Sequence, residues 1–328
     1  MTILVTGAAG FIGSEVAQAL LARGQSVIGI DSLNDYYDVR LKQARLVRLE
    51  GAKLNDGQSF RFLPIDIADR PAMEEFAASA GGTIEGIVHL AAQAGVRYSL
   101  TNPFAYVASN LVGHMTVLEM ARRLPKLGQL VYASSSSVYG GNSKVPFSVE
   151  DRVDDPLSLY AATKRADEAL SISYAHSHGL AQTGLRFFTV YGPWGRPDMA
   201  YFSFTKAIFA DEPLRIFGDG SMRRDFTYID DIVAGVLAAL DRPISAGEHR
   251  LYNLGNNAAA SVNDLIAAIE AATGRTAIRN EVSPPPGEVE ATWADIEASK
   301  RDLGFQPKTA LPAGISRFVD WYRGYYRV

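Results

Sequence analysis

The sequence contains no cysteine among its 328 residues. This absence excludes disulfide bonds, thiolate metal sites and cysteine nucleophiles, and no other metal-binding pattern is evident. There is no apolar run of about 18 residues that would span a membrane. There is also no cluster of lysine and arginine of the kind that binds nucleic acid, and the net charge is −4. We therefore expect no metal ion and neither a membrane nor a nucleic-acid partner.

The composition is that of a globular protein, with 47% hydrophobic and 21% charged residues. A chain of 328 residues is too long for one ordinary hydrophobic core, so about two domains are expected. The first residues enter a strand-like pattern directly, without a basic region or a cleavage site. These features predict a cytoplasmic enzyme.

The opening MTILVTGAAGFIG predicts a strand, a glycine-rich turn and a helix. An apolar run over 2–6 is followed by three spaced glycines, Gly7, Gly10 and Gly13. Such a turn lets backbone N–H groups approach a pyrophosphate at the helix N-terminus. The next strand-like run, 26–30, is followed by Asp31, whose carboxylate would bind both adenosine ribose hydroxyls and repel a 2′-phosphate. The pattern predicts NAD binding, and a turn that serves only strand–helix packing is the alternative.

Strand-like and helix-like patterns alternate along the first half of the chain. Alternation of this kind predicts right-handed crossovers and a parallel sheet with helices on both faces. The strand-like runs cover 2–6, 26–30, 60–65, 86–90, 129–134 and 182–188, and long helical patterns cover 104–124 and 158–178. We predict an α/β fold, a doubly wound parallel sheet of the Rossmann type with a smaller mixed α/β substrate domain.

Proline and glycine mark the expected domain boundary, in the stretch YGPWGRPD and again at 284–286. We expect an NAD-binding domain over 1–192, to which about 229–255 return. Residues 193–228 and 256–328 would form the substrate domain.

Short segments at the ends of other predicted strands fit the same cofactor pocket. Asp66 follows the third strand-like run and could bind an adenine amino group, and helix capping is the alternative role for this residue. The small residues that follow the fourth strand-like run would let the backbone lie against the cofactor. The predicted cofactor contacts are Gly7, Gly10, Phe11, Ile12, Gly13, Asp31, Asp66, Ile67, Leu90, Ala91, Ala92, Tyr160 and Lys164.

Tyr160 and Lys164 are four residues apart in a predicted helix, so their side chains share one face. Tyrosine, with an ordinary pKa near 10, is a poor base at neutral pH, and a nearby ammonium favours the phenolate. A run of four serines, 134–137, follows an apolar strand, which places hydroxyls at the carboxyl end of the sheet where ligands of such folds bind. Together these residues predict a catalytic centre.

The chain resembles the extended short-chain dehydrogenase/reductases, and within them the nucleotide-sugar 4-epimerases. The resemblance rests on GAAGFIG, HLAAQAGVRYS, SSSSVYG, YAATK, LRFFTVYGPWGRPDM and RRDFTYIDDIV. It implies that Ser135 binds the 4-hydroxyl of the sugar, that Tyr160 is the base and that Lys164 assists it. A non-catalytic dinucleotide-sensing protein is the alternative from another class.

Three departures favour one subfamily. Ser136 and Ser137 stand where sugar dehydratases and decarboxylases carry acids, and Thr189 stands where UDP-galactose 4-epimerases carry asparagine. With LNDYYD and GPWGRPDM, these residues make the chain similar to UDP-glucuronate 4-epimerases. The three hydroxyls could bind the glucuronate carboxylate, each bond contributing about 1.5–3 kcal/mol. A 4-epimerase of neutral or N-acetylated UDP-hexoses is the alternative.

The resemblance also implies where the rest of a UDP-sugar binds. Arg224 would bind the diphosphate together with Arg196, and Arg215 lies in the expected uridine-binding strand. The segment Pro285–Glu288 departs from the family pattern.

A homodimer is the expected assembly. The helical patterns 104–124 and 158–178 carry apolar residues over more than one face, which predicts burial on more than one side. The resemblance implies that these two helices form a four-helix contact between subunits.

Overall fold

The computed structural model describes residues 1–283 and 290–328, so the irregular segment Pro285–Glu288 lies outside the described residues. The chain divides into two compact units. Unit 1 comprises 1–140, 152–186 and 233–252, and unit 2 comprises 141–151, 187–232 and 253–328. The functional domain boundaries expected from the sequence stay a prediction.

Unit 1 is built on a seven-stranded sheet with the order β10-β6-β5-β4-β1-β2-β3. The pairings of β1 with β2 and β4, of β2 with β3 and of β4 with β5 are all parallel. The strands are β1 (Thr2–Thr6), β2 (Ser26–Ile30), β3 (Phe60–Leu63), β4 (Ile84–His89), β5 (Gln129–Ser135), β6 (Gln182–Phe187) and β10 (His249–Leu254). The doubly wound sheet predicted from the sequence is confirmed.

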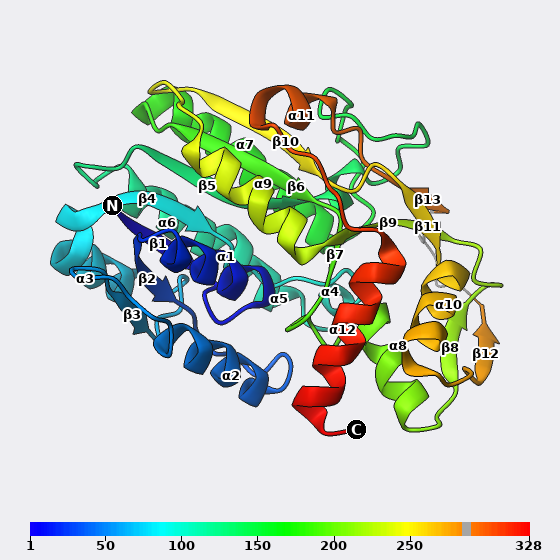
Figure 1. The fold of residues 1–328 in the computed structure, drawn as a ribbon. Helices are drawn as coiled ribbons and strands as arrows, with labels where there is room; N and C mark the ends of the chain where they lie inside the picture. Colours follow the sequence, from blue (N-terminus) through cyan, green and yellow to red (C-terminus); the bar gives the residue numbers. More distant parts are fainter. Residues whose placement is uncertain (284–289) are drawn as a thin grey trace. The chain divides into compact units, whose positions relative to one another are not determined.

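Helices cover both faces of this sheet, with α1 and α9 on the near face and α6 and α7 on the far face in Figure 1. The helices are α1 (Phe11–Ala22), α2 (Val39–Glu50), α3 (Arg70–Ala80), α4 (Tyr98–Thr101), α5 (Pro103–Tyr106), α6 (Gly113–Ala121), α7 (Leu159–His178) and α9 (Ile229–Asp241). Short helical turns are η1 (Gly81–Thr83), η2 (Val107–Val112) and η3 (Ser136–Tyr139). Ser158 caps α7, since its side chain accepts a hydrogen bond from Ala161 N.

The helix predicted over 104–124 is interrupted by a π-helical turn, η2. Asn110 in this turn is buried, and its side chain bonds the backbone N–H and C=O of Gln93 at 2.8 and 3.1 Å. Its amide also donates to Thr163 Oγ1 of α7 at 2.9 Å. Hydrophobic periodicity cannot predict such a turn, because the turn positions Asn110 for hydrogen bonds with polar groups of other elements.

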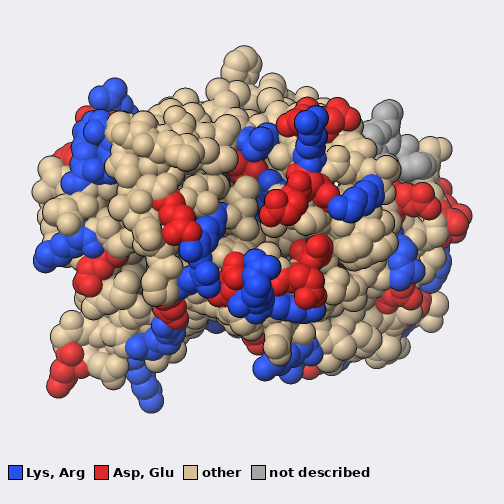
Figure 2. Space-filling model, turned by 90° about the horizontal axis from the view of Figure 1, so that it is seen from above, with Lys and Arg blue, Asp and Glu red and all other residues tan. Residues whose placement is uncertain are grey.

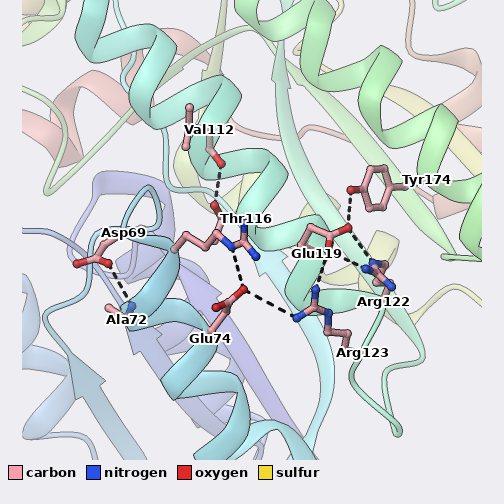
Figure 3. A network of polar contacts seen from close by, with 10 residues as sticks. Asp69, Ala72, Glu74, Val112, Thr116, Glu119, Arg122, Arg123 and Tyr174 are labelled. Atoms are coloured by element: carbon pink, nitrogen blue, oxygen red, sulfur yellow. Dashed lines mark hydrogen bonds and ion pairs between the residues drawn. The ribbon is translucent and has the colours of Figure 1, made fainter.

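The far face of the sheet holds an aliphatic core between β-strands, α3 and α6. Leu4, Ile87 and Leu130 of three strands pack with Met73 and Phe76 of α3 and with Val117 and Leu118 of α6. Figure 3 shows a polar network at the rim of this layer. Glu119 of α6 accepts hydrogen bonds from Tyr174 of α7 at 2.7 Å and from Arg122 and Arg123 at 2.8 and 2.9 Å. Arg123 Nη1 also lies 4.0 Å from Glu74 Oε1 of α3, so contacts of this network link α3, α6 and α7 beside the core.

Unit 2 contains smaller sheets and an aromatic core. Strand β9 pairs with β7, β11 and β13, and β8 pairs with β12. Its elements are β7 (Thr189–Tyr191), α8 (Ala200–Phe209), β8 (Leu214–Phe217), β9 (Arg223–Tyr228), β11 (Ala259–Ser261), α10 (Val262–Thr273), β12 (Arg279–Val282), β13 (Ala291–Thr292), α11 (Glu297–Leu303) and α12 (Leu311–Tyr326). Phe318 of α12 packs edge-on against Tyr201 of α8, with ring centroids 4.8 Å apart.

Within residues 1–283 and 290–328, no helix combines the length and the hydropathy needed to span a membrane. On the face drawn in Figure 2, basic and acidic side chains are interspersed.

Candidate active site

The glycine turn between β1 and α1 is held by close backbone contacts. Gly7 has a φ of +72°, and its N–H donates to Ile30 O at 2.7 Å. A Cβ at Gly13 would lie 2.0 Å from Gly7 O, so only glycine fits there. Gly10 caps α1 without a side-chain hydrogen bond. The first N–H groups of α1 are therefore left for an anionic ligand.

Asp31 lies beside this turn, immediately after β2. Its carboxylate accepts hydrogen bonds from Ala9 N at 3.2 Å and from Leu33 N at 2.9 Å. Behind the turn, the fully buried Arg45 donates to Ala9 O at 3.0 Å and to Tyr37 Oη at 2.6 Å. Sequence reasoning missed Arg45, because a cation on a helix is ordinarily an exposed group.

The other predicted cofactor contacts follow neighbouring strands. Leu90 N donates to Thr6 O at 3.1 Å and Ala91 N to Thr6 Oγ1 at 3.2 Å, which sets this segment against the end of β1. Asp66 is exposed and accepts from Ala68 N at 2.9 Å. Ile67 is buried against Gly113 of α6, where a Cβ would lie 2.7 Å from its side chain. The segment after β4 therefore adjoins the glycine turn, whereas Ile67 belongs to the core.

The serine run begins at the carboxyl end of β5. Ser135 Oγ donates to Ser137 Oγ at 3.1 Å and accepts from Ser137 N at 3.2 Å. Ser136 and Ser137 are half-buried in η3. Ser134 points elsewhere: its hydroxyl donates to the buried Glu168 of α7 at 2.6 Å. Only three of the four serines are therefore available to a ligand.

Tyr160 and Lys164 lie one turn apart on α7. Lys164 is 3% exposed, and its Nζ donates to Ala133 O of β5 at 2.9 Å and to Asp167 Oδ2 at 3.1 Å. The Tyr160 ring packs edge-on against Tyr106 at 6.0 Å between centroids. No hydrogen bond joins its hydroxyl to the described part of the chain. The tertiary fold thus anchors Lys164 to Ala133, two residues before Ser135 on β5. It leaves the phenol of Tyr160 available to a ligand.

A buried ion pair supports the end of β5 from behind. Glu168 is fully buried and accepts hydrogen bonds from Arg186 Nε at 2.8 Å and Nη2 at 2.9 Å. The Arg186 guanidinium also stacks over the Tyr139 ring, 4.9 Å from its centroid. Sequence reasoning missed this pair because its partners are 18 residues apart on different elements.

Four predicted substrate residues belong to unit 2. Thr189 begins β7 and is half-buried, and Arg224 of β9 donates to Arg223 O at 2.9 Å. Arg196 forms an ion pair with Asp198 at 2.6 Å. Arg215 is exposed on β8, with its guanidinium 5.2 Å from the Phe217 ring centroid. Thr189 pairs with Phe226 of β9, which brings Thr189 and Arg224 into one sheet.

Residues 3–255 match the sequence model of the NAD-dependent epimerase/dehydratase family. The chain belongs to this family. Among family members, Protein CapI of Staphylococcus aureus is 44% identical over the full length of both chains. UDP-glucuronate 4-epimerase 2 of Arabidopsis thaliana is 46% identical over all of this chain and 77% of that protein. The resemblance inferred from the motifs is confirmed.

Solved structures of the family agree with this fold. A UDP-glucuronic acid 4-epimerase of Bacillus cereus, in complex with UDP-glucuronic acid and NAD, superposes with a TM-score of 0.89. It is 37% identical, over 99% of this chain and 100% of that chain. A UDP-glucose 4-epimerase of Thermotoga maritima, with UDP-glucose, is 30% identical with a TM-score of 0.87, over 99% and 100% of the two chains.

Proposed function

We propose that this protein is an NAD-dependent UDP-glucuronate 4-epimerase, an isomerase that interconverts UDP-glucuronate and UDP-galacturonate. The observation that carries the proposal is the full-length match to the Bacillus cereus UDP-glucuronic acid 4-epimerase in complex with UDP-glucuronic acid and NAD. UDP-glucuronate 4-epimerases of Arabidopsis thaliana match almost the whole chain as well.

The residues of unit 1 fit NAD. The glycine turn has no room for a Cβ at Gly13, and α1 begins without a side-chain cap. These features would hold the pyrophosphate, while Asp31 would bind the adenosine ribose and Lys164 the nicotinamide ribose. When bound, NAD would supply the redox chemistry, by taking up a hydride from C4 of the sugar and giving it back on the opposite face of the sugar. Because no net redox change results, the cofactor need not leave.

The chain itself supplies the proton chemistry. Tyr160, as phenolate, would take the proton of the 4-hydroxyl and return it after the sugar has turned over as a 4-keto intermediate. Ser135 would hydrogen-bond the 4-hydroxyl, since its Oγ lies at the carboxyl end of β5. Lys164 would stabilise the phenolate through its positive charge. The presence of both Tyr160 and Lys164 favours catalysis over a dinucleotide-sensing role.

Hydroxyls and arginines would recognise the rest of the substrate. Ser136, Ser137 and Thr189 would donate to the glucuronate carboxylate. Arg196, Arg215 and Arg224 would bind the nucleotide diphosphate and uridine. Neutral donors near the carboxylate suit this substrate, because the 4-keto intermediate is a β-keto acid that can lose carbon dioxide.

The test is to incubate the purified protein with UDP-glucuronate and follow the anomeric sugar protons by NMR. The expected product is UDP-galacturonate. The alternative, supported by the likeness to a UDP-glucose 4-epimerase, is epimerisation of neutral or N-acetylated UDP-hexoses. Competition among UDP-glucuronate, UDP-glucose and UDP-N-acetylglucosamine decides, since the highest kcat/KM identifies the substrate.

A homodimer is part of the proposal. Leu100, Phe104, Val107 and Val112 are exposed large apolar residues on consecutive turns of α4, α5 and η2, and Phe104 is 82% exposed. Leu118 and Met120, apolar residues of the helical pattern 104–124 that predicted this interface, instead lie in the core of unit 1. Light scattering should give a mass of about twice 35.5 kDa. Cell fractionation would test the expected cytoplasmic location.

A further inference from the structure

The side chain of Asp167 is buried directly beneath the proposed catalytic pair. Its Oδ2 accepts a hydrogen bond from Lys164 Nζ at 3.1 Å, and the two side chains are 1% and 4% exposed. Within the described residues, Oδ1 of Asp167 is buried and has no hydrogen-bond partner. A buried carboxylate with one oxygen unsatisfied is costly, so a charge interaction must hold it there. Lys164 is the cation in contact with it.

The other titratable groups around Asp167 leave Lys164 as its counter-ion. Glu168, next on α7, accepts hydrogen bonds from Arg186, Ser134 and Arg165. His89 of β4 is buried, and burial together with the charge of Lys164 lowers its pKa to about 3.

Two further groups face Asp167 from neighbouring elements. Burial, with His89 and Lys164, holds the pKa of His114 of α6 well below its usual range, and its Nε2 bonds Ser171 Oγ at 2.9 Å. Burial keeps Tyr132 of β5 protonated by raising its pKa. At neutral pH, both histidines and Tyr132 are uncharged.

Lys164 has three N–H donors, and two of them are engaged by Ala133 O and Asp167 Oδ2. These two acceptors belong to different elements, β5 and α7. They fix the ammonium in the interior and leave one donor for the cofactor ribose, while the positive charge acts on the Tyr160 phenol. A lysine without Asp167 would retain only a neutral acceptor, Ala133 O.

We infer that Asp167 is the positioning residue of Lys164, holding the buried ammonium in place to serve Tyr160 and the nicotinamide ribose. This inference rests on the proposed function for the role of Lys164. Among the described residues, Lys164 is the hydrogen-bond partner of the Asp167 side chain, so Asp167 would act on the reaction through Lys164.

A pH dependence follows from the position of Asp167. Burial raises its pKa to about 6, with Lys164 opposing the shift. Below that pH the carboxyl takes up a proton, and Lys164 loses its counter-ion. Both kcat and retention of NAD should therefore fall as the pH decreases through about 6.

The test is Asp167→Asn, which keeps the size and an acceptor oxygen and removes the charge. We expect kcat to fall about tenfold, since a charge-assisted hydrogen bond becomes a neutral one. The acid limb near pH 6 should disappear. The fraction of protein that keeps NAD through gel filtration, measured from the nucleotide released on denaturation, should fall and lose its pH dependence.

Asp241→Asn is the matched control, since it removes the same charge from an exposed ion pair with Arg23 in the same unit. It should behave like the unmodified protein. If Asp167→Asn also matches the unmodified protein in kcat, acid limb and NAD retention, the inference is overturned. NAD retention needs no sugar substrate, so this arm decides even if UDP-glucuronate is not the substrate.

Should Asp167→Asn fail to fold, Asp167→Glu carries the test, because it keeps the charge. An acid limb and NAD retention preserved in Asp167→Glu support the inference. Loss of both in a protein with unchanged thermal unfolding overturns it.

Discussion

The two units bury charged groups in different ways. Unit 1 buries the side chains of Lys42, Arg45, Lys164, Asp167, Glu168 and Arg186, whereas among the described residues of unit 2 the buried charge is Asp225. In unit 1, the pairs Lys164–Asp167 and Arg186–Glu168 join side chains of opposite sign. In unit 2, Asp225 accepts hydrogen bonds from the backbone N–H groups of Asn257 and Ala294 at 3.1 and 3.0 Å.

The length of the strands explains this difference. The strands of unit 1 have four to seven residues and satisfy one another's backbone groups, so buried side chains are free to form ion pairs. Strands β7, β11 and β13 of unit 2 have two or three residues. Asn257 and Ala294, whose N–H groups donate to Asp225, lie just outside these short strands, before β11 and after β13. Buried side chains thus form ion pairs in unit 1, whereas in unit 2 the buried Asp225 accepts from backbone N–H groups.

The largest expected effect is on catalysis, in unit 1. Tyr160→Phe removes the proposed base but breaks no hydrogen bond to the described residues, so folding and NAD retention should survive. We expect kcat to fall about 10² to 10⁴-fold with little change in KM. Thr189→Val in unit 2 is the comparison: it should lower kcat/KM for UDP-glucuronate by about tenfold and leave the proton path intact. Near-normal turnover by Tyr160→Phe would mean that another group is the base.

The next effect is on the stability of unit 1. Glu168→Gln leaves the buried Arg186 guanidinium without its counter-ion, and we expect a loss of about 3–5 kcal/mol in urea denaturation. Replacing both residues, as Glu168→Leu with Arg186→Met, should cost less than the single change, because no unpaired charge remains. A single-variant loss below about 1 kcal/mol would contradict the importance of the pair.

An aromatic deletion should have a comparable effect in unit 2. Phe318 is fully buried, and its ring contacts Tyr201, Phe202 and Trp321. Phe318→Ala should destabilise the protein by about 3–5 kcal/mol through the cavity it leaves. Hydrogen exchange should accelerate first in unit 2. Ile278→Ala, at a half-exposed position of the same unit, should change stability by less than about 0.5 kcal/mol.

Acid should loosen unit 1 before unit 2, because all five histidines belong to unit 1. Burial lowers the pKa of His89 to about 3 and that of His249 to about 4. The stability that these neutral histidines contribute is present above about pH 6.5 and is lost as the pH falls toward these values. For His89, the loss at pH 5 is roughly 2 kcal/mol. The raised pKa of Asp167, about 6, has the opposite effect, because the folded state binds a proton there more readily than the unfolded chain. Protonation of Asp167 therefore offsets part of this loss of stability.

Hydrogen exchange at pH 5 and pH 7.5, corrected for the intrinsic rate, measures this difference. Faster exchange at pH 5 confined to unit 2 would contradict it.

The smallest effect is expected at the partly exposed network of Figure 3. Hydrogen bonds from Arg122 and Tyr174 lower the pKa of Glu119 to about 2. Its contribution is therefore present above about pH 4.5 and lost as the pH falls toward 2. Glu119→Gln should cost about 1 kcal/mol at pH 7 in thermal unfolding, since such pairs are solvent-screened. If Glu119→Gln lowered the free energy of unfolding as much as Glu168→Gln, the expected difference between buried and partly exposed ion pairs would be wrong.

The sequence alone determined the parallel sheet, and it predicted a cofactor-binding turn and a catalytic helix. Gly7, Gly13 and Asp31 follow consecutive strand signals, and Tyr160 and Lys164 lie one helical turn apart, so local spacing is sufficient to propose them as site residues. Strand ends shifted by one or two residues: the run predicted over 86–90 is β4, Ile84–His89. Apolar periodicity locates a strand but not the residue at which its hydrogen bonds begin.

Only the tertiary structure decided which polar residues surround the site. The contacts of Asn110 with Gln93, of Ser134 with Glu168 and of Glu168 with Arg186 join residues 17, 34 and 18 positions apart. Asp167, three residues from Lys164, looks like an ordinary surface acid in the sequence, and its burial against β5 makes it the counter-ion of Lys164. Burial and long-range pairing depend on how the elements pack, and no local pattern encodes that packing.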